Sequence, residues 1–307
     1  LDIEPEDPMF ARKYHDFTDF FRFPFQDRKH LRFKPMPILP HPVLQESSDF
    51  FEPIRKQEQL LFTPYQDFRY VIDWIRQAAE DAQVTHITIT VYRLAEQSLV
   101  IQELIRASQQ GKQVTVFIEL KARFDEAHNI QWFNKLENAG ASVIYSMERL
   151  KVHSKILIIT RKERGASRKY AYFSTGNFNE DTAQLYSDLG FFTADEGLIH
   201  EAEQIMHYIL SNEEPEPFRE MLVAPFNLRQ RLMAHIDQEI ANAGAGKPAW
   251  IELKVNSLQD PRLVQKLYEA SQAGVPVWII ARSICSLVPD VPGLSDNIRV
   301  ISLVDRL

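Results

Sequence analysis

Apolar residues gather in short blocks along most of the chain, and the period of each block indicates a strand or a helix. Runs of β-branched residues predict buried strands, whereas apolar positions three and four residues apart predict helices. The first half of the chain thereby predicts strands over residues 87–92, 114–120 and 143–145 and helices over 99–110 and 126–139. Gly111 and Gly140 follow these helices directly, which is usual for a helix that ends in a glycine cap.

Further elements are predicted on both sides of this region. Pro64 stands at an expected first helical position, before a helix over residues 65–80. Two strands, over residues 150–159 and 169–174, are expected to pair around Gly165. The remaining predicted elements are a strand over 185–192 and helices over 196–211 and 226–242.

One combination of elements occurs twice. Residues 107–111 and 114–117 form a helix end, its glycine and the next strand, and they resemble residues 270–274 and 277–280. Both copies follow the order strand, helix, glycine, strand. The repeat predicts two related sheets with a binding site between them. Chance similarity between two α/β units is the alternative.

Length and composition predict an α/β protein of more than one domain. The 307 residues are 45% hydrophobic and 25% charged, which is ordinary for a globular protein and long enough for two domains. We expect residues 1–45, rich in proline and phenylalanine, to be the end of a preceding domain and its linker. A first α/β domain is expected over 46–220 and a second over 221–307.

Other sequence features bear on the cellular compartment of the protein and on the extent of the chain. No apolar run reaches the length of a membrane span, and no signal-peptide pattern opens the chain. Cys285 is the single cysteine, so an internal disulfide is excluded, as fits a reducing compartment. Because the sequence starts at Leu1 and stops within an apolar run, we expect a piece of a longer protein.

Charge is distributed unevenly along the chain. The formal net charge of −7 gives no general attraction for polyanions. Residues 148–169, however, hold eight arginines and lysines against two acids. A local positive region of this kind can select an anionic ligand. For residues 161–169, a solvated hairpin turn is the alternative.

His153 is the strongest candidate for chemistry. Lys151 and Lys155 stand two residues away on either side, and all three are expected on one face of the strand over 150–159. An imidazole can attack phosphorus while ammonium groups neutralise the phosphate oxygens. The small polar turn at 174–179 could bring backbone N–H groups and amides to the same anion. An ordinary packed or surface histidine is the alternative.

Three arginines stand at or after the ends of predicted strands, namely Arg93, Arg123 and Arg282. Open α/β sheets bind ligands at the carboxyl ends of their strands, and guanidinium groups suit phosphate. Salt bridges to nearby acids such as Asp125 are the alternative. The chain contains no P-loop motif, so a nucleotide would have to be held in another way.

Five segments, taken in order, resemble bacterial polyphosphate kinases of the first type. They are residues 121–126 (KARFDE), 150–155 (LKVHSK), 174–178 (STGNF), 185–188 (LYSD) and 295–299 (SDNIR). The resemblance extends from about residue 60 to the end of the chain. It implies two tandem phospholipase-D-like α/β domains, the second incomplete, after the tail of a helical domain.

The resemblance also implies a reaction, which is reversible transfer of the ATP γ-phosphate to inorganic polyphosphate. His153 matches the phosphorylated histidine of the family, and Lys155 is expected to act with it. The phospholipase D signature has an aspartate five residues after its lysine, but this chain has Thr160 there. The family's second essential histidine would follow residue 307, so we expect residues 1–307 alone to be inactive.

Further site residues are carried over from the resemblance. Tyr186 and Arg282 match nucleotide-contacting positions, and Asn177 in the polar turn is expected to bind phosphate. Arg93 and Arg123 match positions that the family associates with magnesium. Because arginine cannot ligate a cation, we expect both to hold phosphate oxygens that share the Mg²⁺.

Two other functions stay open from the sequence. One is a phospholipase-D-like phosphodiesterase, which would use the same histidine and transfer to water. The other is a non-catalytic module that binds polyanions. Under the kinase hypothesis we expect ATP, ADP and polyphosphate as partners, no nucleic acid, and a homo-oligomer. We expect a cytoplasmic location, with peripheral attachment to the inner face of the membrane as a variant.

Overall fold

The computed structural model describes His30 and residues 33–34, 36–92, 94–95, 97–119, 126–145 and 151–303. For residues 126–129 the description covers the backbone alone. The chain divides after Pro37 into two compact units, and the features below belong to the second, Ile38–Leu307. The prediction that residues 1–45 end a helical domain falls largely outside the described residues.

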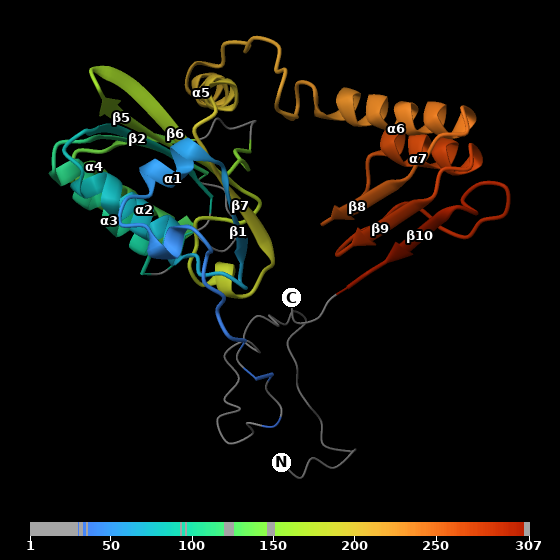
Figure 1. Ribbon diagram of the computed structural model, residues 1–307, viewed down its shortest axis with the longest axis horizontal. Helices are drawn as coiled ribbons and strands as arrows, with labels where there is room; N and C mark the ends of the chain where they lie inside the picture. Colours follow the sequence, from blue (N-terminus) through green and yellow to red (C-terminus); the bar gives the residue numbers. More distant parts are fainter. Residues whose placement is uncertain are drawn as a thin grey trace. The chain divides into compact units, whose positions relative to one another are not determined.

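A seven-stranded mixed sheet forms the larger part of this unit (Figure 1). Its strands, in spatial order, are β1 (Gln59–Thr63), β7 (Asp188–Thr193), β6 (Ala166–Ser174), β5 (Ile156–Glu163), β2 (Val84–Val91), β3 (Gln113–Ile118) and β4 (Ser142–Tyr145). The pairs β2–β3 and β3–β4 are parallel, and the other neighbours are antiparallel. The structure confirms the α/β fold and the hairpin around Gly165, whose φ is +85°.

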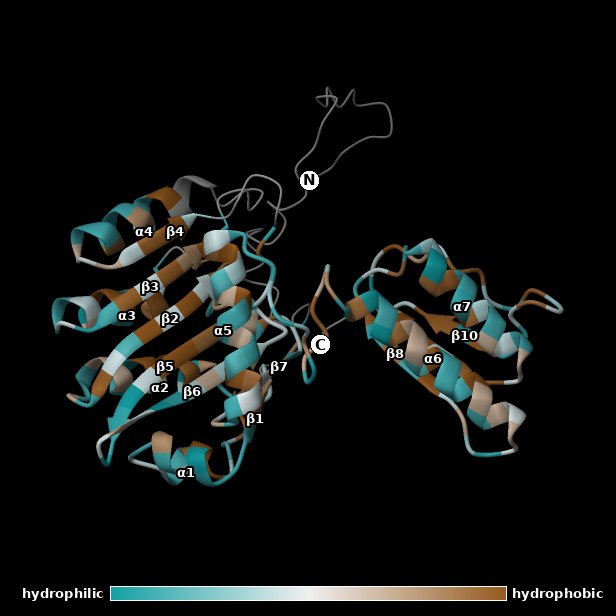
Figure 2. Ribbon diagram, turned by 90° about the horizontal axis from the view of Figure 1, so that it is seen from above, coloured by the Kyte–Doolittle hydropathy of each residue, from teal (hydrophilic) through white to brown (hydrophobic). Residues whose placement is uncertain are grey.

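Helices cover both faces of this sheet (Figure 1). They are α1 (Phe51–Lys56), α2 (Arg69–Glu80), α3 (Leu99–Gln109), α4 (Glu126–Asn138) and, on the opposite face from these, α5 (Glu196–Ser211). On β5, Leu157 and Ile159 pack in the core with α2 and α3, whereas Ile156 and Ile158 pack with α5. Burial on both faces explains why this strand begins with a continuous apolar run, residues 156–159, shown in brown in Figure 2.

A second, three-stranded parallel sheet lies in the last third of the chain. It contains β8 (Ile251–Val255), β9 (Val277–Ala281) and β10 (Ile298–Ile301), with the helices α6 (Leu228–Gly244) and α7 (Pro261–Gln272). Its buried side chains form a hydrophobic core of their own.

The two copies of the sequence repeat end their helices in the same way. After α3, Gly111 N donates to Ser108 O, and the next N–H donates to Ala107 O. After α7, Gly274 N donates to Ser271 O, and the next N–H donates to Ala270 O. Both glycines have φ above +80°, which is costly for other residues. The predicted structural repeat is confirmed at this level.

Several predicted boundaries were wrong. The helix expected over 65–80 begins at Arg69, because Asp67 Oδ1 accepts its backbone N–H there and Pro64 lies in the preceding turn. The strand expected over 150–159 begins at Ile156, and the one expected over 185–192 begins at Asp188. Strand β1 was not predicted. It lies at the edge of the sheet, where only alternate residues are buried.

Strand β1 is held by a buried histidine. His41 Nδ1 accepts the N–H groups of Val43 and Leu44, at 3.2 and 3.0 Å, so the proton of the neutral ring lies on Nε2. Nε2 lies 3.2 Å from the carbonyl oxygen of Leu60 and donates to it. Burial lowers the pKa of His41, because a charged imidazole is disfavoured in this site.

The His41 site predicts a loss of stability in mild acid. In the unfolded chain His41 becomes protonated below pH about 6.5, whereas in the folded protein it stays neutral to a lower pH. The contribution of His41 to the free energy of unfolding is therefore complete above that pH and declines below it. The urea midpoint of wild type should therefore fall from pH 7.5 to 5.5 more than that of His41→Gln. His235→Gln, at an exposed position on α6, should behave as wild type. Equal pH dependence in wild type and His41→Gln would contradict the assignment.

Glu201 on α5 anchors the segment that leads towards α6. This carboxylate is buried and accepts the backbone N–H groups of Arg219, Glu220 and Met221, at 2.6, 3.0 and 2.8 Å. Burial alone would raise the pKa of Glu201, but these donors outweigh it and the pKa lies below its usual value. The anchor needs a group that only accepts hydrogen bonds.

Glu201→Gln should destabilise the protein by about 1–3 kcal/mol, because its amide NH₂ would face an N–H donor. Amide exchange at residues 219–221 should become faster. The matched control is Glu203→Gln on the same helix, which loses a half-exposed ion pair to Lys169 worth at most about 1 kcal/mol. Similar effects of the two substitutions would argue against the anchor.

Candidate functional site

His153 lies in an irregular segment, residues 151–155, directly before β5. Strand alternation therefore does not place Lys151, His153 and Lys155, contrary to the prediction. Lys151 and His153 are exposed, whereas Val152 is buried with Ile156 and Ile158 in the core under α5. Lys155 is buried too, with 6% of its surface exposed. The segment thus rests on the core and presents His153 to solvent.

The structure brings Lys155 directly to His153. Lys155 Nζ lies 3.1 Å from His153 Nδ1 and donates to the His153 carbonyl oxygen. Because an ammonium group can only donate, Nδ1 is the acceptor and the proton of the neutral ring lies on Nε2. The ring of Tyr92 stands edge-on to the imidazole, with centroids 5.3 Å apart, and lies 5.5 Å from Lys155 Nζ. This is a positive charge held beside an exposed imidazole.

The polar turn adjoins this pair. Ser174 N donates to Lys155 O at 3.0 Å, which fixes the start of the turn beside the His153 segment. Gly176 N donates to the Ser174 hydroxyl, and a Cβ on Gly176 would come within 2.9 Å of three Asp188 side-chain atoms. The Asn177 Oδ1 is buried without a hydrogen-bond partner within the described part of the chain. Only a group that donates a hydrogen bond could satisfy this oxygen, so any contact of Asn177 with an anion has to come from its NH₂ group.

A second group of predicted site residues forms around Tyr186. The guanidinium carbon of Arg282 lies 5.3 Å from the centre of the Tyr186 ring, within cation–π range. Beside them, Lys254 Nζ donates to the Ser187 hydroxyl at 3.3 Å. Lys254 was not predicted, because an exposed lysine on a short strand has no distinguishing signal in the sequence. Arg93 and Arg123 lie outside the described residues.

Arg282 has a structural counterpart in the first α/β segment. Its backbone N–H donates to Val255 O at the end of β8, and Glu119 N donates to Val91 O at the end of β2, both at 3.1 Å. The same position after the repeated strand therefore holds an arginine in one copy and a buried glutamate in the other. Glu119 Oε2 accepts Val152 N at 3.1 Å, next to His153. This glutamate was not predicted, because no motif in the sequence distinguishes it.

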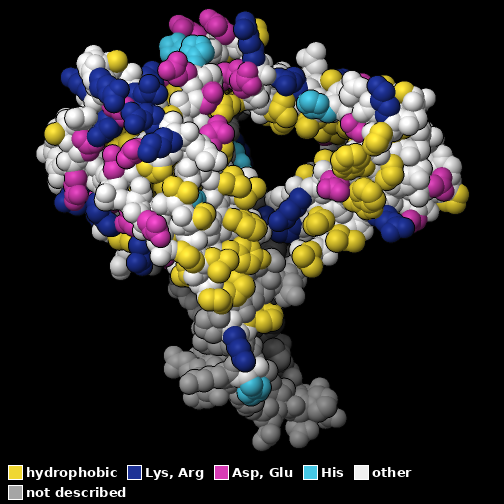
Figure 3. Space-filling view, in the orientation of Figure 1, with side chains coloured by type: hydrophobic (Ala, Val, Ile, Leu, Met, Phe, Trp, Pro, Cys, Tyr) yellow, Lys and Arg dark blue, Asp and Glu magenta, His cyan; other side chains and the backbone are white. Residues whose placement is uncertain are grey.

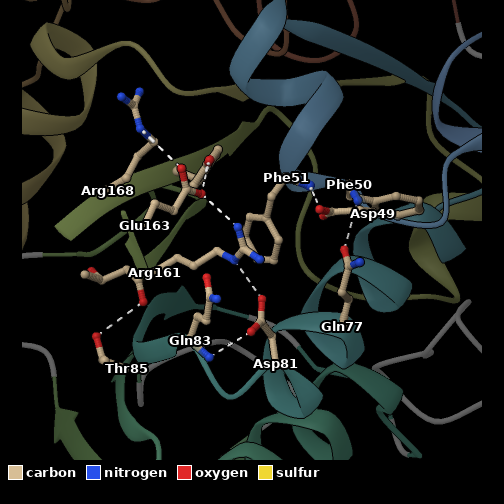
Figure 4. A network of polar contacts seen from close by, with 12 residues as sticks. Asp49, Phe50, Phe51, Gln77, Asp81, Gln83, Thr85, Arg161, Glu163 and Arg168 are labelled. Atoms are coloured by element: carbon tan, nitrogen blue, oxygen red, sulfur yellow. Dashed lines mark hydrogen bonds and ion pairs between the residues drawn. The ribbon is translucent and has the colours of Figure 1, made fainter. Parts of the chain in front are cut away.

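Three of the basic residues after His153 form ion pairs, namely Arg161, Arg168 and Lys169. Arg161 pairs with Asp81 at 2.7 Å and with Glu163 at 3.0 Å (Figure 4). Glu163 also accepts the Tyr170 hydroxyl. Lysines and arginines on this end of the molecule are interleaved with acids, seen as dark blue among magenta in Figure 3. The hairpin interpretation of residues 161–169 is supported, and Lys155 remains the cation of this stretch that contacts His153.

The described residues contain no group of three or more histidine, cysteine, aspartate or glutamate side chains that could hold a metal ion. The described helices also include none with both the length and the apolar composition needed to cross a bilayer.

Fold and site together define a class of protein, an α/β protein with a His-x-Lys pair beside its larger mixed sheet. The structure of phosphatidylserine synthase from Haemophilus influenzae shares the fold, with a TM-score of 0.51 and 13% identity over 74% of this chain and 61% of that one. Within this class, the chain belongs to the polyphosphate kinase family. The models of polyphosphate kinase C-terminal domains 1 and 2 match residues 49–215 and 221–307.

Individual relatives agree with this membership. Polyphosphate kinase of Escherichia coli K12 is 44% identical over 96% of this chain and 43% of its own length, and that of Yersinia pestis is 43% identical over 100% and 45%. The crystal structure of polyphosphate kinase from Porphyromonas gingivalis superimposes with a TM-score of 0.83 and 38% identity, covering 96% of this chain and 49% of that one. The chain thus spans less than half the length of these relatives.

Proposed function

We propose that this chain carries the phosphate-transfer site of an ATP–polyphosphate phosphotransferase, in which His153 is the transient phosphate carrier. The observation that carries the proposal is the buried Lys155 ammonium group, 3.1 Å from the ring of an exposed histidine, in a chain of the polyphosphate kinase family. A buried cation beside an imidazole suits a nucleophile that must approach a phosphate of several negative charges.

The reaction would run in two balanced steps. A lone pair of the neutral His153 ring forms a bond to the γ-phosphorus of ATP. The bond from that phosphorus to the β–γ bridging oxygen breaks, and ADP leaves with its electron pair. A terminal oxygen of polyphosphate then attacks the same phosphorus, and the N–P bond returns its electrons to His153. A phosphoimidazole keeps a high transfer potential, which suits a reversible reaction.

Lys155 would control the ring as well as the phosphate. In the ligand-free geometry its ammonium group donates to His153 Nδ1 and keeps the proton on Nε2. An incoming phosphate competes for this ammonium group. Once Lys155 turns to a phosphate oxygen, Nδ1 can take up the ring proton through solvent, and Nε2 gains the lone pair needed for attack.

The other predicted residues keep their proposed roles. Tyr186 and Arg282, which lie together, would hold the nucleotide, and Asn177 would bind a phosphate group through its amide NH₂. Arg93 and Arg123 would hold phosphate oxygens that share Mg²⁺. Mg²⁺ would come bound to the phosphates of ATP, and no step here is assigned to it.

We also propose the organisation and setting predicted from the sequence. The domain boundaries are 46–220 and 221–307. The substrates are ATP, ADP and inorganic polyphosphate, and nucleic acid is not one, in keeping with the net charge of −7. The protein would form a homo-oligomer and act in the cytoplasm or at the inner face of the membrane.

Labelling with γ-³²P-ATP tests this function in the protein expressed from its complete gene. The expected result is a label on His153 that is labile in acid and stable in base, and that moves to polyphosphate on its addition. Hydrolysis of a phosphodiester without a labelled protein would replace the proposal with a phosphodiesterase. Polyphosphate binding with neither activity would replace it with a binding module.

A further inference from the structure

The segment that carries His153 lacks the regular backbone pairing of a strand, and only its last residue, Lys155, accepts a hydrogen bond from β6, from Ser174 N, within the described residues. The β2–β5 pairing ends at Ile89 opposite Leu157, and β5 itself begins at Ile156. Residues 151–155 continue past this end in an irregular conformation. A nucleophile needs a fixed position, because a displacement of about 1 Å can reduce a rate about 10²-fold. Contacts other than strand pairing must hold residues 151–154.

Thr90 of β2 takes the place of the missing backbone partner. Its hydroxyl donates to Ser154 O at 2.7 Å and accepts Ile156 N at 2.9 Å. The side chain is 1% exposed, and a β-branched residue has few χ1 rotamers, so the hydroxyl is rigidly placed. One side chain thereby makes two hydrogen bonds to the backbone on the C-terminal side of His153.

Glu119 holds the backbone on the N-terminal side of His153. It follows β3, is 1% exposed, and its Oε2 accepts Val152 N at 3.1 Å. Its own backbone N–H donates to Val91 O, so the glutamate is tied to β2 one residue beyond Thr90. The two side chains, from neighbouring strands, thus bind the backbone at residues 152, 154 and 156. They leave His153 and Lys155, at the alternate positions, to face each other.

We propose that Thr90 and Glu119 are positioning residues that fix the His153 imidazole and the Lys155 ammonium group for attack on the γ-phosphate. This inference rests on the proposed function. It assigns the geometry of the nucleophile to two buried side chains rather than to the strand that the sequence pattern predicts. Neither side chain has to touch a substrate.

Thr90→Val is the sharpest test, because valine has the same shape and removes both hydrogen bonds. In the protein expressed from its complete gene, the rate of His153 phosphorylation by ATP should fall about 10²-fold, with little change in the KM for ATP. Thr90→Ser restores the hydroxyl and should recover most of the rate. The matched control is Thr88→Val, two residues earlier on β2 and opposite Ile158, which should leave the rate unchanged.

Glu119 offers a second, independent pair of variants. Glu119→Gln keeps an oxygen that can accept the Val152 N–H, so it should retain more of the phosphorylation rate than Glu119→Leu, which keeps none. Loss of rate in both variants to the same extent would show that the hydrogen bond to Val152 is not what the glutamate contributes, and would overturn its part in the proposal.

Hydrogen exchange supplies a measure that does not depend on activity. Peptides covering residues 151–157 should exchange faster in Thr90→Val than in wild type or Thr88→Val, while peptides from the smaller sheet should exchange as in wild type. A Thr90→Val protein that forms phosphohistidine at the wild-type rate would overturn the positioning role. Failure of Thr90→Ser to recover the rate would do so as well. A wild-type protein that takes up no label overturns the proposed function itself, even where the exchange result holds.

Discussion

His153→Ala should abolish the growth of polyphosphate chains in the protein expressed from its complete gene. Removal of a covalent nucleophile typically costs on the order of 10⁶-fold in rate, because no neighbouring group can take over the bond to phosphorus. Incorporation of γ-³²P into polymer measures the forward reaction, and formation of ATP from ADP and polyphosphate measures the reverse. Both should fall together, since one intermediate serves both directions.

Two controls make this result specific. His235→Ala, at an exposed position on α6, should keep full activity. His153→Ala should keep its affinity for polyphosphate and its melting temperature, because the imidazole is exposed and contributes little packing. A variant that lacks His153 and still extends polyphosphate at a tenth of the wild-type rate would remove this residue from the mechanism.

Gly190→Ala should be the most destabilising single methyl addition in the larger sheet. A Cβ at this position would come within 2.6 and 2.7 Å of two ring carbons of Tyr172 and closer still to its hydroxyl oxygen. The Tyr172 ring is 1% exposed and packs against Phe178 and Phe192, so it has no room to move. We expect a loss of about 3 kcal/mol or more, measured as a fall in melting temperature.

Gly244→Ala is the matched control for this prediction. Gly244 is the last residue of α6, and nothing lies within 4 Å of a Cβ added there. Alanine should stabilise this helix by about 0.5–1 kcal/mol, since it loses less backbone entropy on folding. Tyr172→Phe removes the hydroxyl and should recover part of the loss in Gly190→Ala. Equal melting temperatures for Gly190→Ala and Gly244→Ala would contradict the packing argument.

The sequence predicted correctly those helices whose ends are set by residues close together in the chain. Helix α5 has the predicted bounds because Asp195 caps its start, with Oδ1 accepting Leu198 N, and its apolar positions recur at helical spacing. The glycines after α3, α4 and α7 mark helix ends because their φ values are positive. Strand β1 was not predicted, because an edge strand that is buried on one face has a weak hydrophobic pattern. Its pairing with β7 also joins residues that are far apart in the chain.

The candidate site also has one part that was predicted from the sequence and one part that was not. The spacing of His153 and Lys155 was visible in the sequence, and the structure confirms that the two side chains meet. The predicted reason, alternation along a strand, was wrong. The segment is held by Thr90 and Glu119, whose bonded partners lie 64 and 33 residues away along the chain. No periodicity in the sequence relates residues at such separations.

The sequence by itself determined the α/β order, the repeat, the glycine-ended helices and the histidine–lysine pair, because each depends on residues close together in the chain. The tertiary structure alone decided where β5 starts, which side chains hold the His153 segment, and that Arg282 meets Tyr186. These depend on strand register and on buried hydrogen bonds between distant residues. A buried donor or acceptor must find a partner wherever the fold supplies one, and only the folded chain shows which.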